Sequence, residues 1–312
     1  MKAWIWIALG AWVLPAWAQS LPAPVDLPSA ASARQWMEQD PGVQAARSAL
    51  AAAGHTANML TVSPYEWTTR LTAQRRSFER GSSSKEWHAQ LERPIRIGGK
   101  AALDRQLGDV ELEIAIAAVG EAVHESARLL LELWIDGLAA AQAEKLLSGQ
   151  LAFAQANLSA VKRRKKAGDA SALEVSVASA DLSDVQRQAE LAKSTLDKAR
   201  AKLRIRFAGV QLPEQVMADP LPPAYPEAHW LQRVLDTADP LKVALGQLRR
   251  AELTASRTSA DRLPDPTVGV FAASEGFRTE QIVGVSISIP LGGTYRKERM
   301  LRALQEAEVA RA

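Results

Sequence analysis

The sequence predicts a mixed α+β protein that combines long antiparallel helical hairpins with β-strands. Three observations support this fold class. Apolar residues recur at spacings of three and four through most of residues 98–206, apolar and polar residues alternate in two runs at 65–78 and 86–97, and the same order of elements returns after residue 236. These are the periods of a coiled coil, of a sheet with two unlike faces, and of an internal repeat.

The N-terminus predicts a secretory signal peptide over residues 1–18. Lys2 precedes an apolar stretch that is too short for a membrane-spanning helix, and Ala16-Trp17-Ala18 fits the small-x-small pattern of a cleavage site. An uncleaved N-terminal anchor helix is the alternative. Residues 19–33, rich in proline, serine and alanine, predict a flexible leader.

The first repeat is expected to span residues 34–206. It begins with a helix that Pro64 ends, followed by the two alternating runs on either side of a polar turn. Each run has about the length of a tilted transmembrane strand, and aromatic residues near the run ends suit a membrane interface. A β-hairpin packed on a soluble core would show the same alternation, so periodicity alone leaves both interpretations open.

The long hairpin is expected as a helix over 98–166, a turn at 167–171 and a second helix over 172–206. The second helix carries an uninterrupted heptad seam, which is typical of a coiled coil, and its many alanines allow close approach of a partner helix. This seam comprises Val175, Ala178, Leu182, Val185, Ala189, Ala192, Leu196, Ala199 and Leu203.

The turn contains its own stop and start signals. Gly168 can adopt the left-handed conformation that ends a helix, and Ser171 with Glu174 matches a capping box for the next helix. The basic run at 162–166 complements the dipole at a helix C-terminus. The alternative is a docking surface for an acidic partner or for anionic headgroups.

A proline-rich connector is expected over residues 207–235, after which the second repeat begins. It contains a helix, strands at 267–273 and 281–290, and the start of a long helix. Since this copy stops at Ala312, early in that helix, we expect the chain to be C-terminally truncated.

Several classes of function lack support in the sequence. There is no cysteine, and the net charge of +3 is too small to indicate a nucleic-acid partner. The four histidines are scattered, and no catalytic, cofactor-binding or metal site is expected. The sequence therefore contains no residues that support the interpretation as a periplasmic enzyme.

Three motifs together resemble the TolC-type family of outer-membrane efflux proteins. They are LERPIRIGGKAALDR, KKAGDASALEVSVASADL and SISIPLGGTYRKERM. The Gly-Gly-Lys of the first motif resembles the heavy-metal efflux branch, which is CzcC-like. The resemblance covers essentially the whole mature chain.

The resemblance implies a homotrimer in the outer membrane, with transmembrane strands forming one 12-stranded barrel and a coiled-coil tunnel extending into the periplasm. It implies a passive exit duct that works with a periplasmic adaptor and an inner-membrane RND-type pump. The Gly-Gly-Lys motif indicates heavy-metal cations as the exported substrate. In the truncated form we expect this activity to be incomplete. A periplasmic adaptor or scaffold with a coiled-coil hairpin is the alternative.

The resemblance also implies two sets of site residues. One is a tip at which the adaptor docks. The other is the transition from barrel strand to tunnel helix, where a proline is tolerated at the strand end and glycines permit unusual backbone angles. The tip comprises Gly168, Ser171, Leu173, Glu174 and Val175, with Arg164 and Lys165 from the basic run, and the transition comprises Pro94, Gly98, Gly99, Pro290, Gly292 and Gly293.

Overall fold

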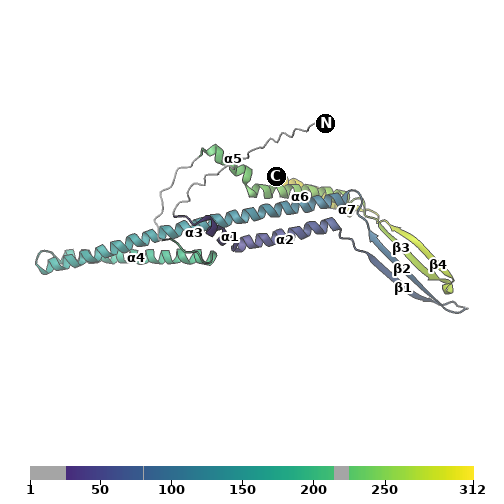
Figure 1. The fold of residues 1–312 in the computed structure, drawn as a ribbon, viewed down its shortest axis with the longest axis horizontal. Coiled ribbons are helices and arrows are strands. Elements are labelled where there is room, and N and C mark those ends of the chain that lie inside the picture. Colours follow the sequence, from purple (N-terminus) through teal and green to yellow (C-terminus); the bar gives the residue numbers. More distant parts are fainter. Residues whose placement is uncertain (1–25, 80, 214–224) are drawn as a thin grey trace, which may run out of the picture. The chain divides into compact units, whose positions relative to one another are not determined.

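The structure is a computed structural model that describes residues 26–79, 81–213 and 225–312 (Figure 1). The expected signal peptide, residues 19–25 of the leader and residues 214–224 of the connector lie outside the described residues. The chain divides into two compact units, a hairpin unit around residues 133–205 and a sheet unit that contains both strand pairs.

The hairpin unit is built from the second half of α3 (Lys100–Lys166) and from α4 (Ala172–Arg206). Every residue of the α4 seam is buried or half-buried, and nearly every other α4 residue is exposed. Ala154 and Leu158 of α3 are buried in the same way. The predicted seams are therefore the faces along which this hairpin packs, since a coiled coil buries only its heptad positions.

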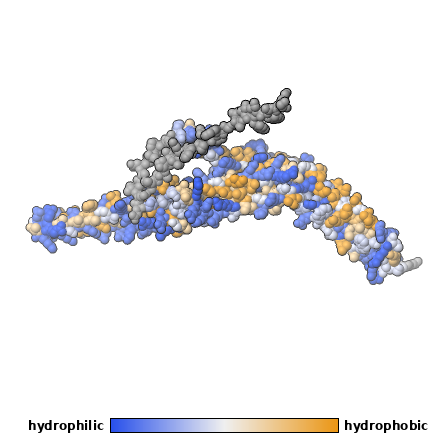
Figure 2. All heavy atoms as spheres, in the orientation of Figure 1, coloured by the Kyte–Doolittle hydropathy of each residue, from blue (hydrophilic) through white to orange (hydrophobic). Residues whose placement is uncertain are grey.

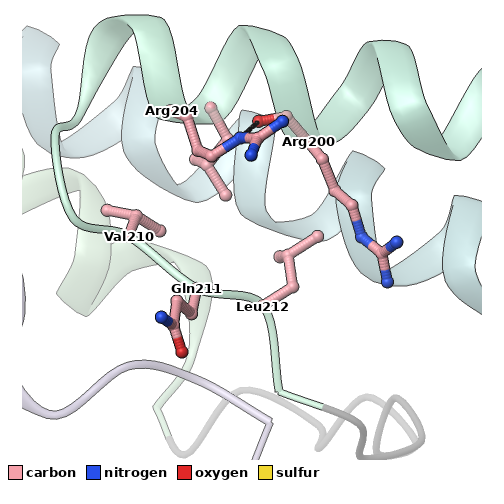
Figure 3. A pocket seen from close by; sticks show the side chains of 6 residues that line it. Arg200, Arg204, Val210, Gln211 and Leu212 are labelled. Atoms are coloured by element: carbon pink, nitrogen blue, oxygen red, sulfur yellow. Dashed lines mark hydrogen bonds between the residues drawn. The ribbon is translucent and has the colours of Figure 1, made fainter.

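Two further segments are anchored on the hairpin unit. The backbone oxygen of Asp26 accepts a 2.7 Å hydrogen bond from the indole of Trp134 on α3. Leu212 packs against Gly137, where a Cβ would approach the leucine within 2.6 Å. Beside this contact a hollow of about 260 Å³ is lined by side chains of α4 and of the segment after it (Figure 3). Its lining residues are Arg200, Leu203, Arg204, Val210, Gln211 and Leu212.

The sheet unit contains the remaining elements. The first repeat contributes α2, β1, β2 and the start of α3, and the second contributes α6, β3, β4 and α7. Their bounds are α2 Pro41–Val62, β1 Thr68–Arg76, β2 Ser84–Pro94, α5 Glu227–Thr237, α6 Asp239–Ala260, β3 Thr267–Glu275, a short 3-10 helix at Gly276–Arg278, β4 Glu280–Ser288 and α7 Thr294–Arg311.

The four strands form one antiparallel sheet in the order β1-β2-β3-β4 (Figure 1). The pairing of β2 with β3 joins the two repeats, with Leu91 opposite Val270. β1 and β4 each pair on one side only, so the described sheet has two open edges. Open edges present unpaired backbone groups that favour pairing with further strands.

The register separates the side chains onto two unlike faces, because successive residues of a strand point to opposite sides. What we call the apolar face is bare: Leu71, Val283 and Val285 are 75, 84 and 78% exposed. It comprises Thr69, Leu71, Ala73 and Arg75 of β1, Lys85, Trp87, Ala89, Leu91 and Arg93 of β2, Val268, Val270, Ala272 and Ser274 of β3, and Gln281, Val283, Val285 and Ile287 of β4. Figure 2 shows hydrophobic residues gathered over the visible part of this unit.

The opposite face, which we call the polar face, carries a network of charged and amide side chains. Arg76 lies 3.2 Å from Glu86 and 3.9 Å from Glu275, and Gln74 donates to Glu86 at 2.8 Å. Phe271 stacks on His88 and fills the space beside Gly284, where a Cβ would clash with its ring. Its charged residues are Arg70, Arg76, Glu86, Glu92, Glu275 and Glu280.

The helices of the sheet unit approach one another through small residues. At Gly108 of α3, a Cβ would come within 2.9 Å of the α2 backbone at Ala57. Ala255 of α6 packs with Ala303 and Ala307 of α7 in a small buried cluster. None of the helices among the described residues combines the length and the apolarity that crossing a membrane requires.

The strands differ from their expected bounds by up to three residues at an end, and α1 (Ala30–Glu38) begins within the expected leader. The larger differences concern the first helix and the connector. Asp40 divides the first expected helix into α1 and α2, and its carboxylate caps α2 by accepting from Gly42 N–H. The expected connector at 207–235 contains most of α5. The prolines that predict a connector end at Pro226, so the residues after it are free to form a helix.

Candidate functional site

The turn between α3 and α4 has a fully specified backbone. Gly168 has a φ of +81°, and its N–H donates to Lys165 O, while Asp169 N–H donates to Arg164 O. This pair of bonds is the Schellman motif, which satisfies carbonyl groups at a helix C-terminus. A residue with a Cβ would be strained at Gly168, because left-handed φ values favour glycine.

Side chains close the same turn. Ser171 Oγ accepts from Glu174 N–H at 3.1 Å, and Glu174 accepts from Ser171 N–H at 2.6 Å, which completes the capping box. The hydrogen bond from Ser171 N–H is the main cause of a lowered pKa at the Glu174 carboxyl. Arg164 reaches across to Asp169, donating to both its carboxylate and its backbone oxygen.

These contacts divide the predicted tip residues into two groups. Gly168, Ser171, Glu174 and Arg164 shape the turn, and Val175 is half-buried in the hairpin seam. Leu173, which is 72% exposed, and Lys165 project from it. Figure 2 shows that the surface around the turn is mostly hydrophilic. Leu173 and, one turn further along α4, Val177 are exposed apolar side chains, at 72 and 61%.

The pairing of Asp169 with Arg164 is a contact in the turn that sequence reasoning missed. Arg164 and Asp169 are five positions apart, a spacing that does not pair side chains on a continuous helix. Their contact exists only because the helix ends between them.

The junction between β2 and α3 is the second candidate site. Pro94 is the last β2 residue and pairs with Thr267, and Ile95 N–H then donates to Pro266 O at 2.9 Å. Gly98 and Gly99 follow with φ values of +66° and +77°. Two consecutive left-handed residues redirect the chain within a short space, a conformation that side chains with a Cβ strongly resist.

A buried lysine fixes this junction to the loop before β3. Lys100 is 1% exposed, and its Nζ donates to Asp265 Oδ1 at 2.8 Å and to Leu263 O at 2.7 Å. Asp265 also accepts from Ile97 N–H at 3.1 Å and from the Tyr65 hydroxyl at 2.7 Å. Burial opposes ionisation of Asp265, but these hydrogen bonds outweigh it and lower the pKa of the carboxyl.

A second buried cluster adjoins the first. Arg96 donates to Asp104 at 2.7 Å and to the last carbonyls of α2, Leu60 O and Thr61 O. Arg257 pairs with Asp104 from the other side. Arg257 also pairs with Asp261, whose carboxylate lies 3.5 Å from Lys100 Nζ and so links the two clusters. Three cations and three carboxylates therefore pair in the interior of the junction, as buried charges require, and the exposed Arg299 lies 3.6 Å from Asp261 at its edge.

The second strand-to-helix transition corrects the expectation that both glycine pairs supply unusual backbone angles. Gly293 has an extended φ of −142°, and Gly292 is not among the residues with positive φ. Pro290 follows the end of β4 and is exposed, as are both glycines. Arg296 ties this transition to the body of the unit by donating to Asp261 O at 2.7 Å.

The described residues contain no group of three or more His, Asp or Glu side chains placed to hold a metal ion. His88 lies on the polar face of the sheet, stacked on Phe271.

Comparison with known proteins finds relatives of this chain. The chain is 26% identical over 208 residues to the cobalt-zinc-cadmium resistance protein CzcC of Cupriavidus metallidurans, a match that covers 65% of this chain and 50% of that protein. It therefore spans about half the length of this curated relative. No family model matches the chain.

Solved outer-membrane channels share the fold. The Campylobacter jejuni CmeC outer membrane channel superposes with a TM-score of 0.70 at 12% identity, over 90% of this chain and 65% of that one. CusC, whose structures concern folding and transmembrane channel formation, gives 0.67 at 14% identity, over 90% and 70%. The chain has the TolC-type fold. The predicted resemblance and the predicted fold class are thereby confirmed.

The TolC-type junction generates a prediction about Tyr65. Burial and the hydrogen bond to Asp265 raise the pKa of Tyr65 to about 12. A group with a raised pKa stabilises the fold fully below its unfolded value, near 10, and this contribution is lost as pH rises through about 12. The free energy of unfolding should therefore fall less between pH 10 and pH 12 in Tyr65→Phe than in the unchanged protein. In an absorbance titration, the phenolate that forms near pH 12 should be missing from the variant. A Tyr65 that ionises at its ordinary pH would contradict the junction described above.

Proposed function

We propose that this chain is the outer-membrane channel component of a tripartite efflux system. It acts as a passive exit duct, localised to the outer membrane with its helical tunnel in the periplasm. The observation that carries the proposal is the four-stranded sheet with one bare apolar face and one charged face. Such a sheet is stable when lipid covers the apolar face and water fills the space beside the polar one.

The open edges support assembly into a homotrimer. Within a bilayer every backbone N–H and C=O must be paired, so a sheet with free edges has to close on further strands. Three copies of a four-stranded sheet supply twelve strands, as the predicted barrel requires. We propose that β1 of one copy pairs with β4 of the next.

The charges on the polar face favour cations as the exported substrate. Four glutamates and two arginines give this face an excess of two negative charges. Rings of acidic side chains favour cation passage through a channel. The similarity to a cobalt-zinc-cadmium resistance protein points to heavy-metal cations within this class.

The turn between α3 and α4 is the proposed docking site for a periplasmic adaptor, which an inner-membrane RND-type pump supplies with substrate. The rigid turn presents Leu173 and Lys165 to solvent. An exposed apolar side chain beside a basic helix end fits an amphipathic partner with acidic residues.

The alternative, a periplasmic adaptor with a coiled-coil hairpin, agrees less well with the sheet. A soluble β-structure covers its apolar face with a second layer, as in a sandwich. Here the apolar face has no layer over it among the described residues, and Leu71 and Val283 are largely exposed.

Neighbouring residues on β1 provide a sharp test of the duct. Leu71 and Thr72 are both exposed in the single chain but lie on the apolar and polar faces. Leu71→Lys should therefore remove the chain from the detergent-extracted outer-membrane fraction, because a lysine facing lipid costs about 2–4 kcal/mol at mid-membrane. Thr72→Lys, facing water, should leave both extraction and trimer mass unchanged. Equal behaviour of the two variants would contradict a membrane-facing apolar side.

Docking at the turn can be tested by photo-cross-linking in the producing cells. A photoreactive residue at Leu173 should form an adduct with a periplasmic adaptor protein. Leu191 is the matched control, because it is 62% exposed and lies five full turns along the same face of α4, about 27 Å away. Adaptor adducts of equal yield from both positions, or none from position 173, would contradict the proposed docking site.

A further inference from the structure

Two cations lie directly opposite one another on the apolar face of the sheet. Arg75 of β1 pairs in register with Lys85 of β2, and both are exposed. Like charges at directly opposed positions destabilise an antiparallel sheet unless something neutralises them. Arg75 Nε is held by Ser83 Oγ at 2.8 Å, which leaves its terminal amino groups free to bind an anion.

The described residues place no counter-charge at this position. Neither cation forms an ion pair among the described residues, whereas Arg70 and Arg76 on the polar face both have glutamate partners. Every carboxylate of the four strands lies on the polar face. A second copy pairing along β1 through its own β4 would bring Gln281 to the apolar face and no acid.

The position of the two cations matches a membrane boundary. Arg93 lies over the Trp67 ring at 5.7 Å and marks the end of the apolar face nearest the helices. Lys85 is eight residues from Arg93 along β2, about 26 Å at 3.3 Å per residue, which is about 20 Å of height for a strand tilted by about 40°. The apolar band of an outer-membrane protein is about 25 Å tall, so Arg93 at one end and Arg75 with Lys85 at the other lie close to the two boundaries of such a band.

We propose that Arg75 and Lys85 form a binding site for the phosphate group of an anionic lipid in the outer leaflet. This rests on the proposed function, which places the helices in the periplasm and the β1–β2 turn at the outer surface. A guanidinium and an ammonium facing one another can share one phosphate, with the arginine donating two hydrogen bonds. The acyl chains of the same lipid would then cover Trp87 and the apolar residues below it.

The test is a calorimetric titration of the detergent-solubilised 312-residue chain with short-chain phosphatidic acid. Diacylglycerol of the same chain length lacks the phosphate, and inorganic phosphate lacks the chains. Arg75→Gln and Lys85→Gln should each weaken binding of phosphatidic acid about fivefold. Arg70→Gln is the matched control, since it removes one positive charge from the same strand on the polar face, and it should leave binding unchanged.

Each contrary outcome overturns the proposal. Equal weakening by Arg75→Gln and Arg70→Gln would show that only the overall charge matters. Diacylglycerol or inorganic phosphate binding as tightly as phosphatidic acid would show that the site does not recognise a lipid phosphate. Circular dichroism of each variant checks that the fold is retained. Because the titration is done in detergent, its result is independent of the membrane-retention test that decides the proposed function.

Discussion

The buried ion pair between Lys100 and Asp265 is the contact on which the sheet unit depends. It joins the first helical residue after β2 to the loop that leads into β3, two segments far apart in the sequence. A buried ammonium without its carboxylate is strongly unfavourable, so the two segments must meet for the chain to fold. Once they meet, the end of β2 and the start of β3 are aligned, and the pairing between the repeats follows.

The alignment of β2 with β3 in turn determines which residues share a face. A shift by one residue would exchange the apolar and polar faces of one strand pair relative to the other. In the observed register the valines of β4 continue the row that Leu71 and Leu91 begin. The same register gathers all the strand carboxylates on the other side. The proposed channel wall needs this division, because one side would meet hydrocarbon and the other would meet water and solutes.

Local signals made much of this architecture predictable. The heptad seam of α4, the left-handed Gly168 and the Ser171–Glu174 capping box are properties of residues close in sequence, and the structure contains all three. The buried network was not predictable in the same way. Asp265 gives no sign in sequence that it faces Lys100, because the pairing depends on how two repeats associate.

The two similar strand-to-helix motifs adopt different backbone conformations. Both transitions contain a proline and a glycine pair, yet only Gly98 and Gly99 adopt left-handed backbone angles. The first glycine pair is followed directly by the buried Lys100 and its carboxylate partner, whereas the residues on either side of Gly292 and Gly293 are exposed and Gly293 is extended. Sequence alone identifies the transition, and the packing around it decides its geometry.

The central claim is tested most directly by native-state hydrogen exchange at the amide of Ile95, which donates to Pro266 across the junction. Lys100→Met should lower the free energy of opening at this amide by about 3 kcal/mol, because Asp265 is left buried without its cation. Lys242→Met, at an exposed lysine of the same unit, is the control and should change it little. Unchanged protection of Ile95 in Lys100→Met would show that the ion pair does not hold the two repeats together.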